Sequence, residues 1–362
     1  RRQRQMCIRD RGSDKLTWEK SYKTNIGLEM MLWGKLNLTL DYYWERRKDI
    51  LIQRSSLPSM AGFDASIYAN MGEMDNKGVD ANLEYQTRIG NKVGLRLFGN
   101  LTYSKNKIVF RDEPAMQYAY QKSEGTRYGE FYGYIAEGYF QSEEEIKKSP
   151  RQMRELAPGD IKYKDLNDDG VIDANDQCYL GKSWFPSWSY GMGFNINYHN
   201  FDLALFFQGV SDVSIMANGG SIDTGNGDWG ASGVGIVPFT GMGLNPSNVI
   251  TKALDRWTAD NPRADAWYPR MTANATTNDN NYVNSTHWLK DGSYLRLKQA
   301  SLGYTLENKK LMDKGIEYLY FYLSGQNLLT FSKFKLWDPE LGSNGAKYPL
   351  SRMVTLGMRV SF

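Results

Sequence analysis

The sequence predicts an all-β protein, an antiparallel transmembrane β-barrel with long extracellular loops. Three observations lead to this prediction. Segments of about ten residues alternate between apolar and polar side chains, short turns alternate with long loops, and no apolar run reaches the roughly 18 to 20 residues of a membrane-spanning helix. Because lipid offers no hydrogen-bond partner for the backbone, a chain without such helices crosses a membrane as a barrel.

The last ten residues, MVTLGMRVSF (353–362), show the alternation most clearly. One face of the expected strand carries Val354, Leu356, Met358, Val360 and Phe362. A tilted strand of about this length crosses a bilayer with its apolar face toward lipid. We expect the terminal aromatic residue, Phe362, to serve as the barrel-assembly signal. The closing strand of a soluble β-sandwich would alternate in the same way, so this strand alone does not distinguish a barrel from a sandwich.

The order of strands and turns along the chain carries the barrel prediction further. Strands are expected at 24–32, 36–52, 70–87, 93–103, 188–198, 201–207, 291–306, 318–327 and 353–362. Short turns follow at 33–35, 90–91, 199–200 and 307–315, and barrels keep such turns on the periplasmic side. Region 104–186 is of mixed character, so we count nine membrane-crossing strands, or eleven if this region crosses the membrane twice. Because single-chain bacterial barrels have an even number of strands, we expect at least one further strand upstream of those counted here.

The amino-acid composition indicates which kinds of molecule the protein is suited to bind. The 24 Tyr and 10 Trp residues suit the aromatic girdles of a membrane barrel, although glycan-binding surfaces also favour these residues. The net charge of +3, without a basic cluster in a folded element, argues against nucleic acid. Two cysteines do not make a disulfide framework. With only two histidines and no phosphate loop, zinc spacing or nucleophile elbow, the sequence predicts no enzyme.

Several motifs occur in the order found in one transporter family. They are NMGEMDNKGVDANLEYQT (70–87), with Asp80 where the family more often has Glu, PGDIKYKDLNDDGVIDANDQ (158–177), LDRWTADNPRADAWYPRM (254–271), DGSYLRLKQASLGYTL (291–306) and QNLLTFSKFKLWDPE (326–340). Together they resemble the C-terminal barrel of SusC/RagA-type TonB-linked outer-membrane transporters. The resemblance implies that residues 13–362 are the C-terminal part of a larger, 22-stranded barrel. Residues 1–12 are dense in Arg and do not alternate, so we interpret them as a non-native leader.

The resemblance also implies a function and partners. Such a protein would import oligosaccharides or peptides across the outer membrane of a Gram-negative, Bacteroidetes-like bacterium. A SusD-like surface lipoprotein would cover the extracellular loops, and TonB would contact the protein from the periplasm. Two alternatives stay open on the residues alone. They are a passive outer-membrane pore and a secreted β-sandwich that binds carbohydrate.

Residues 165–176 form the best-defined chemical motif. Oxygen-bearing groups stand at positions 1, 3, 5, 9 and 12 of a calcium-binding pattern, Gly170 stands at position 6, and position 7 supplies a backbone carbonyl. The candidate Ca²⁺ ligands are Asp165, Asn167, Asp169, Val171, Asp173 and Asp176. Because position 12 is Asp rather than Glu, we expect weak binding, with a Kd of about 10⁻⁴ to 10⁻³ M. A metal-free turn is the alternative, since Asp, Asn and Gly favour turns.

Aromatic residues in the expected extracellular loops are candidates for contact with substrate or with a partner protein. They are Trp229, Trp257, Trp267 and Tyr268. Aromatic rings stack on sugars and line small-molecule sites. The alternative is that these rings pack the loops against one another.

Overall fold

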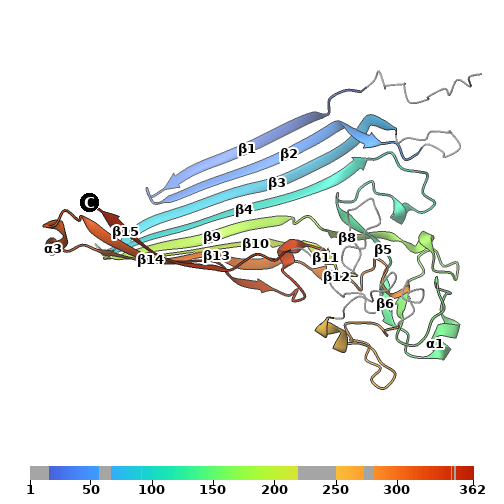
Figure 1. Cartoon of the computed structure of the whole chain (residues 1–362). Helices are drawn as coiled ribbons and strands as arrows, with labels where there is room; N and C mark the ends of the chain where they lie inside the picture. The colour runs from blue at the N-terminus through green and yellow to red at the C-terminus, as the bar shows by residue number, and fades with distance from the viewer. Residues whose placement is uncertain are drawn as a thin grey trace, which may run out of the picture.

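The computed structural model describes residues 16–56, 67–90, 92–218, 250–272, 280–343, 345 and 348–362. A nine-stranded antiparallel sheet forms the body of the molecule, and a compact loop region lies at one end of it (Figure 1). The strands follow the order β1-β2-β3-β4-β9-β10-β13-β14-β15, so each neighbour is the next long strand along the chain. This is an up-and-down meander, the connectivity of outer-membrane barrels.

The nine strands expected from the alternation are all present, and several are longer than the predicted segments. Their bounds are β1 Lys20–Leu32, β2 Leu36–Gln53, β3 Tyr68–Ile89, β4 Val93–Phe110, β9 Trp188–Tyr198, β10 Phe201–Ser211, β13 Tyr294–Leu306, β14 Tyr318–Ser332 and β15 Met353–Ser361. Among the described residues these strands form one sheet rather than two packed sheets, which makes the β-sandwich alternative wrong.

The alternative count of eleven strands is also wrong. The strands between residues 104 and 186 pair only in short ribbons, β5 (Glu130–Gly133) with β8 (Cys178–Ser183) and β6 (Ala136–Tyr139) with β7 (Ile161–Tyr163). A third ribbon joins β11 (Ser214–Met216) to β12 (Leu289–Asp291). In the part of the chain that the structure describes, the other regular elements are two short helices, α1 (Glu143–Lys148) and α3 (Lys309–Met312), and four 3₁₀ turns, η3 (Ala119–Gln121), η4 (Ala174–Asp176), η6 (Thr251–Leu254) and η7 (Pro339–Leu341).

The connections between the long strands differ at the two ends of the sheet. At one end, residues 33–35, 90–92, 199–200 and 307–317 close the hairpins, the last with α3. Trp33, Gly34 and His199 adopt positive φ there, the conformation that tight hairpin turns require. The described parts of the long connections, with the ribbons, lie at the other end (Figure 1). Short turns mark the periplasmic side of a barrel, so the long connections are extracellular.

No helix within the described part of the chain is long and apolar enough to span a membrane.

The backbone pairing aligns apolar side chains in rows across one face of the sheet. One row consists of Leu95, Ile196, Leu203, Leu302, Leu323 and Leu356. The row nearer the short turns is Val93, Tyr198, Phe201, Tyr304, Phe321 and Met358. Toward the extracellular end, Tyr42, Val79, Tyr103 and Trp188 form a further row. Aromatic rings therefore border an aliphatic band on both sides, as in the girdles of membrane barrels.

The height of this band matches a membrane. Ten residue steps along β4 separate Val93, in the row near the short turns, from Tyr103 in the extracellular row. At about 3.4 Å per residue and a tilt of about 40°, these steps rise about 26 Å, close to the apolar band of outer-membrane barrels. Leu356 and Val354 of β15 expose 80% and 70% of their surface, which lipid would cover.

The opposite face of the sheet is polar and carries the small residues. One row on this face consists of Arg96, Asn195, Ala204, Ser301, Ser324 and Thr355. In the next row, Gly303 lies between Asp202 and Tyr322. The Tyr320 hydroxyl reaches across Gly303 and donates a hydrogen bond to Asp202 at 3.0 Å. A Cβ at Gly303 would lie 2.2 Å from that hydroxyl, so only glycine leaves room for this contact.

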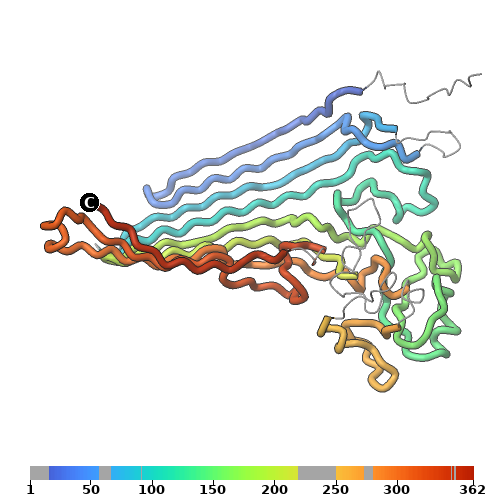
Figure 2. The backbone as a smooth tube through the Cα atoms, in the orientation of Figure 1, coloured from blue at the N-terminus to red at the C-terminus, as the bar shows by residue number. Residues whose placement is uncertain are grey.

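Both edges of the sheet are open. Strands β1 and β15 each pair on one side only among the described residues, and the tube trace shows them apart (Figure 2). The predicted leader (residues 1–12) lies outside the described residues and stays a prediction. Phe362 follows β15 at the periplasmic end and is 84% exposed, and its role in assembly also stays a prediction.

The two faces predict opposite responses to a charge. Leu205 lies in the apolar band between Phe194 and Ala300, while its neighbour Ala204 faces the polar side. We expect Leu205→Arg to lower the free energy of unfolding in lipid vesicles by about 2 to 4 kcal/mol, the cost of Arg on the lipid face near midplane. Ala204→Arg, the matched control, should cost much less. Equal losses in a denaturant titration would contradict the assigned lipid face.

Candidate functional site

The extracellular loop region has a hydrophobic core of its own, centred on Trp288. This residue is fully buried, and its ring centroid lies 5.2 Å from that of Tyr282 and 5.6 Å from that of Tyr268. Its indole nitrogen donates to the carbonyl of Asn281 at 2.7 Å. The loops are therefore a packed unit that can hold a surface in a fixed shape.

A buried ion pair joins two motifs that lie far apart in the sequence. Arg270, from YPR, places Nε 2.7 Å from Oδ1 of Asp160, and its terminal nitrogen donates to Oδ2 at 2.9 Å. Asp160, from PGD, exposes only 1% of its surface and also accepts hydrogen bonds from the Ala157 backbone and the Asn281 amide. The carboxylate has lost its water but has gained four protein contacts, so its burial is compensated.

The same packing buries two of the aromatic candidates. Tyr268 has no exposed surface and Trp257 exposes 6%, and both belong to the core around Trp288. Trp257 lies against Gly159, where a Cβ would be 2.2 Å from the indole ring. The loops pack on both rings, and their contact with substrate or with a partner protein stays a prediction. Trp229 lies outside the described residues.

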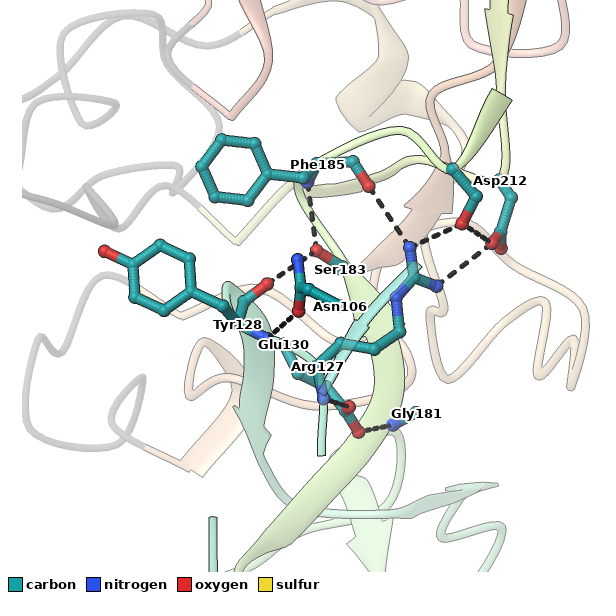
Figure 3. Close-up of polar contacts among 9 residues, drawn as sticks. Asn106, Arg127, Tyr128, Glu130, Gly181, Ser183, Phe185 and Asp212 are labelled. Atoms are coloured by element: carbon teal, nitrogen blue, oxygen red, sulfur yellow. Dashed lines mark hydrogen bonds and ion pairs between the residues drawn. The ribbon is translucent and has the colours of Figure 1, made fainter. Parts of the chain in front are cut away.

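Arg127 ties the loop region to the ends of two long strands (Figure 3). Its guanidinium lies 3.0 Å from the Asp212 carboxylate, just beyond β10, and donates to the Ser187 hydroxyl just before β9 at 2.6 Å. Burial would raise the pKa of Asp212, but the Ser187 hydrogen bond and the Arg127 charge outweigh burial and lower it. The sequence does not predict this anchor, since Arg127 and Asp212 are 85 residues apart and nothing local pairs them.

Arg296 makes a second anchor on the polar face of β13. It exposes 1% of its surface and its guanidinium contacts Asp338 at 2.6 Å, Glu340 at 2.7 Å and the Thr330 hydroxyl at 3.0 Å. Asp338 and Glu340 belong to the WDPE segment after β14. This segment is therefore drawn back over the polar face of the sheet, and the residues that precede it, 333–336, are held at the rim.

The predicted calcium loop folds as a series of side-chain-capped turns. The Gly170 backbone donates to Asp165 Oδ2 at 2.8 Å, and the Val171 backbone donates to Asp169 Oδ1 at 2.8 Å. Asp176 is fully buried and accepts from the backbones of Leu166 and Asp173. These bonds are the ones expected of a metal-free Asp/Asn/Gly turn.

One observation on this loop favours a cation and another does not. Asp165 Oδ1 is buried and has no hydrogen-bond partner, as expected of a metal ligand at position 1. Within the described residues, however, no three His, Cys, Asp or Glu side chains converge where they could hold a metal ion. Calcium binding by Asp165, Asn167, Asp169, Val171, Asp173 and Asp176 therefore stays a prediction.

A cavity with a volume of about 770 Å³ opens at the extracellular rim. We call it the rim cleft. It lies between η6, β12 and the segment 333–336, and its lining includes Trp267, Lys252, Lys290, Lys333 and Lys335. Of the three aromatic candidates within the described residues, Trp267 alone lines this cleft, and the Lys290 ammonium lies 5.3 Å from its ring centroid.

Burial changes the titration of the side chains beneath the cleft. Burial and the neighbouring charge of Lys252 lower the pKa of Lys290 to about 8. Burial, with the charge of Lys290, lowers the pKa of His287 to about 4, so His287 is neutral. Its Nε2 lies 3.1 Å from the carbonyl of Trp267 and therefore carries the proton and donates it. His287 supports the wall of the cleft rather than acting as a base.

The Asp160–Arg270 pair yields a stability prediction. Arg270→Met should destabilise the loop region by about 3 to 5 kcal/mol, because the buried Asp160 carboxylate loses its countercharge. Hydrogen exchange of the loop amides measures this loss. Arg263→Met removes an exposed arginine that pairs with Asp255 and Asp265, and it should leave exchange almost unchanged. Similar exchange in both variants would contradict the importance of the buried pair.

Calcium binding is tested by calorimetric titration of the folded protein in detergent. We expect saturable binding with a Kd of about 10⁻⁴ to 10⁻³ M, lost in Asp165→Asn and retained in Asp313→Asn, which changes an exposed turn at the periplasmic end. No saturable binding at millimolar calcium would leave the metal-free turn as the explanation of the motif.

Comparisons with known proteins agree with this geometry. The family model described as TonB dependent receptor-like, beta-barrel matches residues 7–328. The chain is 28% identical over 386 residues to TonB-dependent receptor P3 of Formosa agariphila, covering 99% of this chain and 35% of that protein. It is 23% identical to TonB-dependent receptor SusC of Bacteroides thetaiotaomicron, covering 97% of this chain and 32% of SusC.

Solved structures show the same fold. The RagAB peptide importer in the open-open state superposes with a TM-score of 0.70 at 24% identity, over 96% of this chain and 35% of that chain. The chain thus spans about 35% of the relatives that it matches. The resemblance to SusC/RagA-type barrels is confirmed. The chain belongs to the TonB-dependent receptor-like β-barrel family, and its sheet lies in the outer membrane of a Gram-negative bacterium.

Proposed function

We propose that the protein takes part in TonB-dependent transport across the outer membrane and that its cargo is an oligosaccharide or a peptide. The observation that carries this proposal is the match of nearly the whole chain to the RagAB barrel, including the packed loops at the extracellular end. TonB-dependent receptors are transporters, so we infer a transport role rather than an enzymatic one.

The substrate class and partners are inferred from relatives. RagAB is a peptide importer, and SusC is a TonB-dependent receptor. By this likeness, a SusD-like surface lipoprotein would dock on the extracellular loops and TonB would act from the periplasm. The rigid loop core around Trp288 supports docking, because a preformed surface loses little conformational entropy when a partner binds.

A passive pore is the competing function, and energy coupling separates the two. Cells that lack the gene should lose uptake of one class of fluorescent oligosaccharide or peptide. The intact gene should restore that uptake in a strain with functional TonB and fail to restore it in a strain without TonB. Restoration in both strains would show passive diffusion and contradict the proposal.

The lipoprotein partner is tested by co-purification. The protein isolated in detergent from native outer membranes should bring a SusD-like lipoprotein with it at a one-to-one ratio. Isolation without any surface lipoprotein, at a salt concentration that preserves membrane complexes, would contradict the partner while leaving TonB-dependent uptake intact.

A further inference from the structure

The rim cleft is an open concavity with an excess of positive charge. Four lysines line it, and Asp291 is the one carboxylate among the described lining residues. Asp291 lies 3.8 Å from the ammonium of Lys333, on an exposed part of the wall. Lys252 is paired with Asp255 at 2.8 Å, outside the lining. These two pairs neutralise only part of the charge.

Lys290 is the lining residue whose partly buried charge an anion would stabilise. It is partly buried, its ammonium donates to the His287 carbonyl at 2.6 Å, and it has no carboxylate partner in the described part of the chain. Lys335, an exposed residue of the lining, likewise forms no ion pair with a described residue. Withdrawing an ammonium from water is costly, and an oxyanion in the cleft would offset that cost. The lowered pKa of Lys290 reports the same cost.

Three independent segments bring these charges together. Lys290 comes from β12, Lys252 from η6 and Lys335 from the segment after β14, which the contacts of Arg296 hold in place. The wall behind Lys290 is equally fixed, because Trp267 packs at 5.4 Å from Trp288, measured between ring centroids. The cleft is therefore preorganised, and the binding of a ligand costs little rearrangement.

We propose that the rim cleft binds a carboxylate group of an acidic solute, between Lys290 and Lys335 and beside Trp267. This inference rests on the proposed transport function, and it names an acidic oligosaccharide or acidic peptide as the preferred cargo. The ammonium groups would bind the carboxylate oxygens by charge-assisted hydrogen bonds. The position at the extracellular rim is that of a first capture site for solute arriving from outside.

Binding is measured by calorimetry on the protein purified in detergent from outer membranes. The probes are a Glu-rich hexapeptide with its Gln isostere, and trigalacturonate with galactotriose. We expect one acidic probe to bind about tenfold more tightly than its neutral match, since a hydrogen bond to a charged group contributes about this factor. Higher salt should weaken the acidic probe only.

Substitutions locate the site. Lys290→Met and Lys335→Met should each weaken binding of the acidic probe about tenfold and leave the neutral probe unchanged. Lys310→Met in α3, at the periplasmic end, is the matched control and should bind as the unchanged protein does. Heat-modifiable migration on gels shows that each variant keeps its folded barrel, so lost binding is not lost folding.

Several outcomes overturn the proposal. They are equal affinity for acidic and neutral probes, unchanged binding in both cleft variants, and displacement by acetate at the same carboxylate concentration, which would show a counter-ion site only. Failure of the transport function is separate. If uptake in cells were independent of TonB, acidic probes would still bind the purified protein through Lys290. If TonB-dependent uptake carried neutral solutes alone, the proposed carboxylate site would be wrong and the transport function would stand.

Discussion

The structure depends on one constraint, the satisfaction of backbone polar groups where no water is present. An unpaired N–H or C=O in hydrocarbon costs several kcal/mol, so the strands within the apolar band must form an unbroken antiparallel ladder. The ladder then fixes the register, and the register places every second side chain on the lipid face. Leu203, Leu302 and Leu323 line up across three strands for this reason, and Ala204 and Ser301 line up on the polar face.

The extracellular loops use the ends of this ladder as fixed points. Arg127 and Asp212 attach the loop region to the ends of β9 and β10, and Arg296 attaches the segment after β14 to β13. Between these anchors, the buried Asp160–Arg270 pair and the aromatic core hold the loops together. The rim cleft results from this arrangement, because its walls come from segments that the anchors position separately.

Strand order and turns were predictable because both arise from local sequence. Period-2 alternation fixes a strand and its faces within ten residues, and a turn such as 199–200 interrupts it sharply. The loop contacts were not predictable, since Asp160 and Arg270 are 110 residues apart and nothing local pairs them. Trp257 and Trp267 are two tryptophans of one motif, yet Trp257 lies in the core and Trp267 lines the rim cleft. Only the packing around Trp288 separates them.

Electron paramagnetic resonance can measure whether β10 crosses lipid with one defined face. A nitroxide label is placed in turn at residues 202 to 207, in a background in which Cys7 and Cys178 are replaced by Ser, and accessibility to oxygen and to a polar nickel complex is measured in vesicles. We expect a two-residue period, with accessibility to oxygen highest at positions 203, 205 and 207 and accessibility to the nickel complex highest at 202, 204 and 206. Uniform accessibility to the nickel complex at all six positions would contradict a lipid-facing strand.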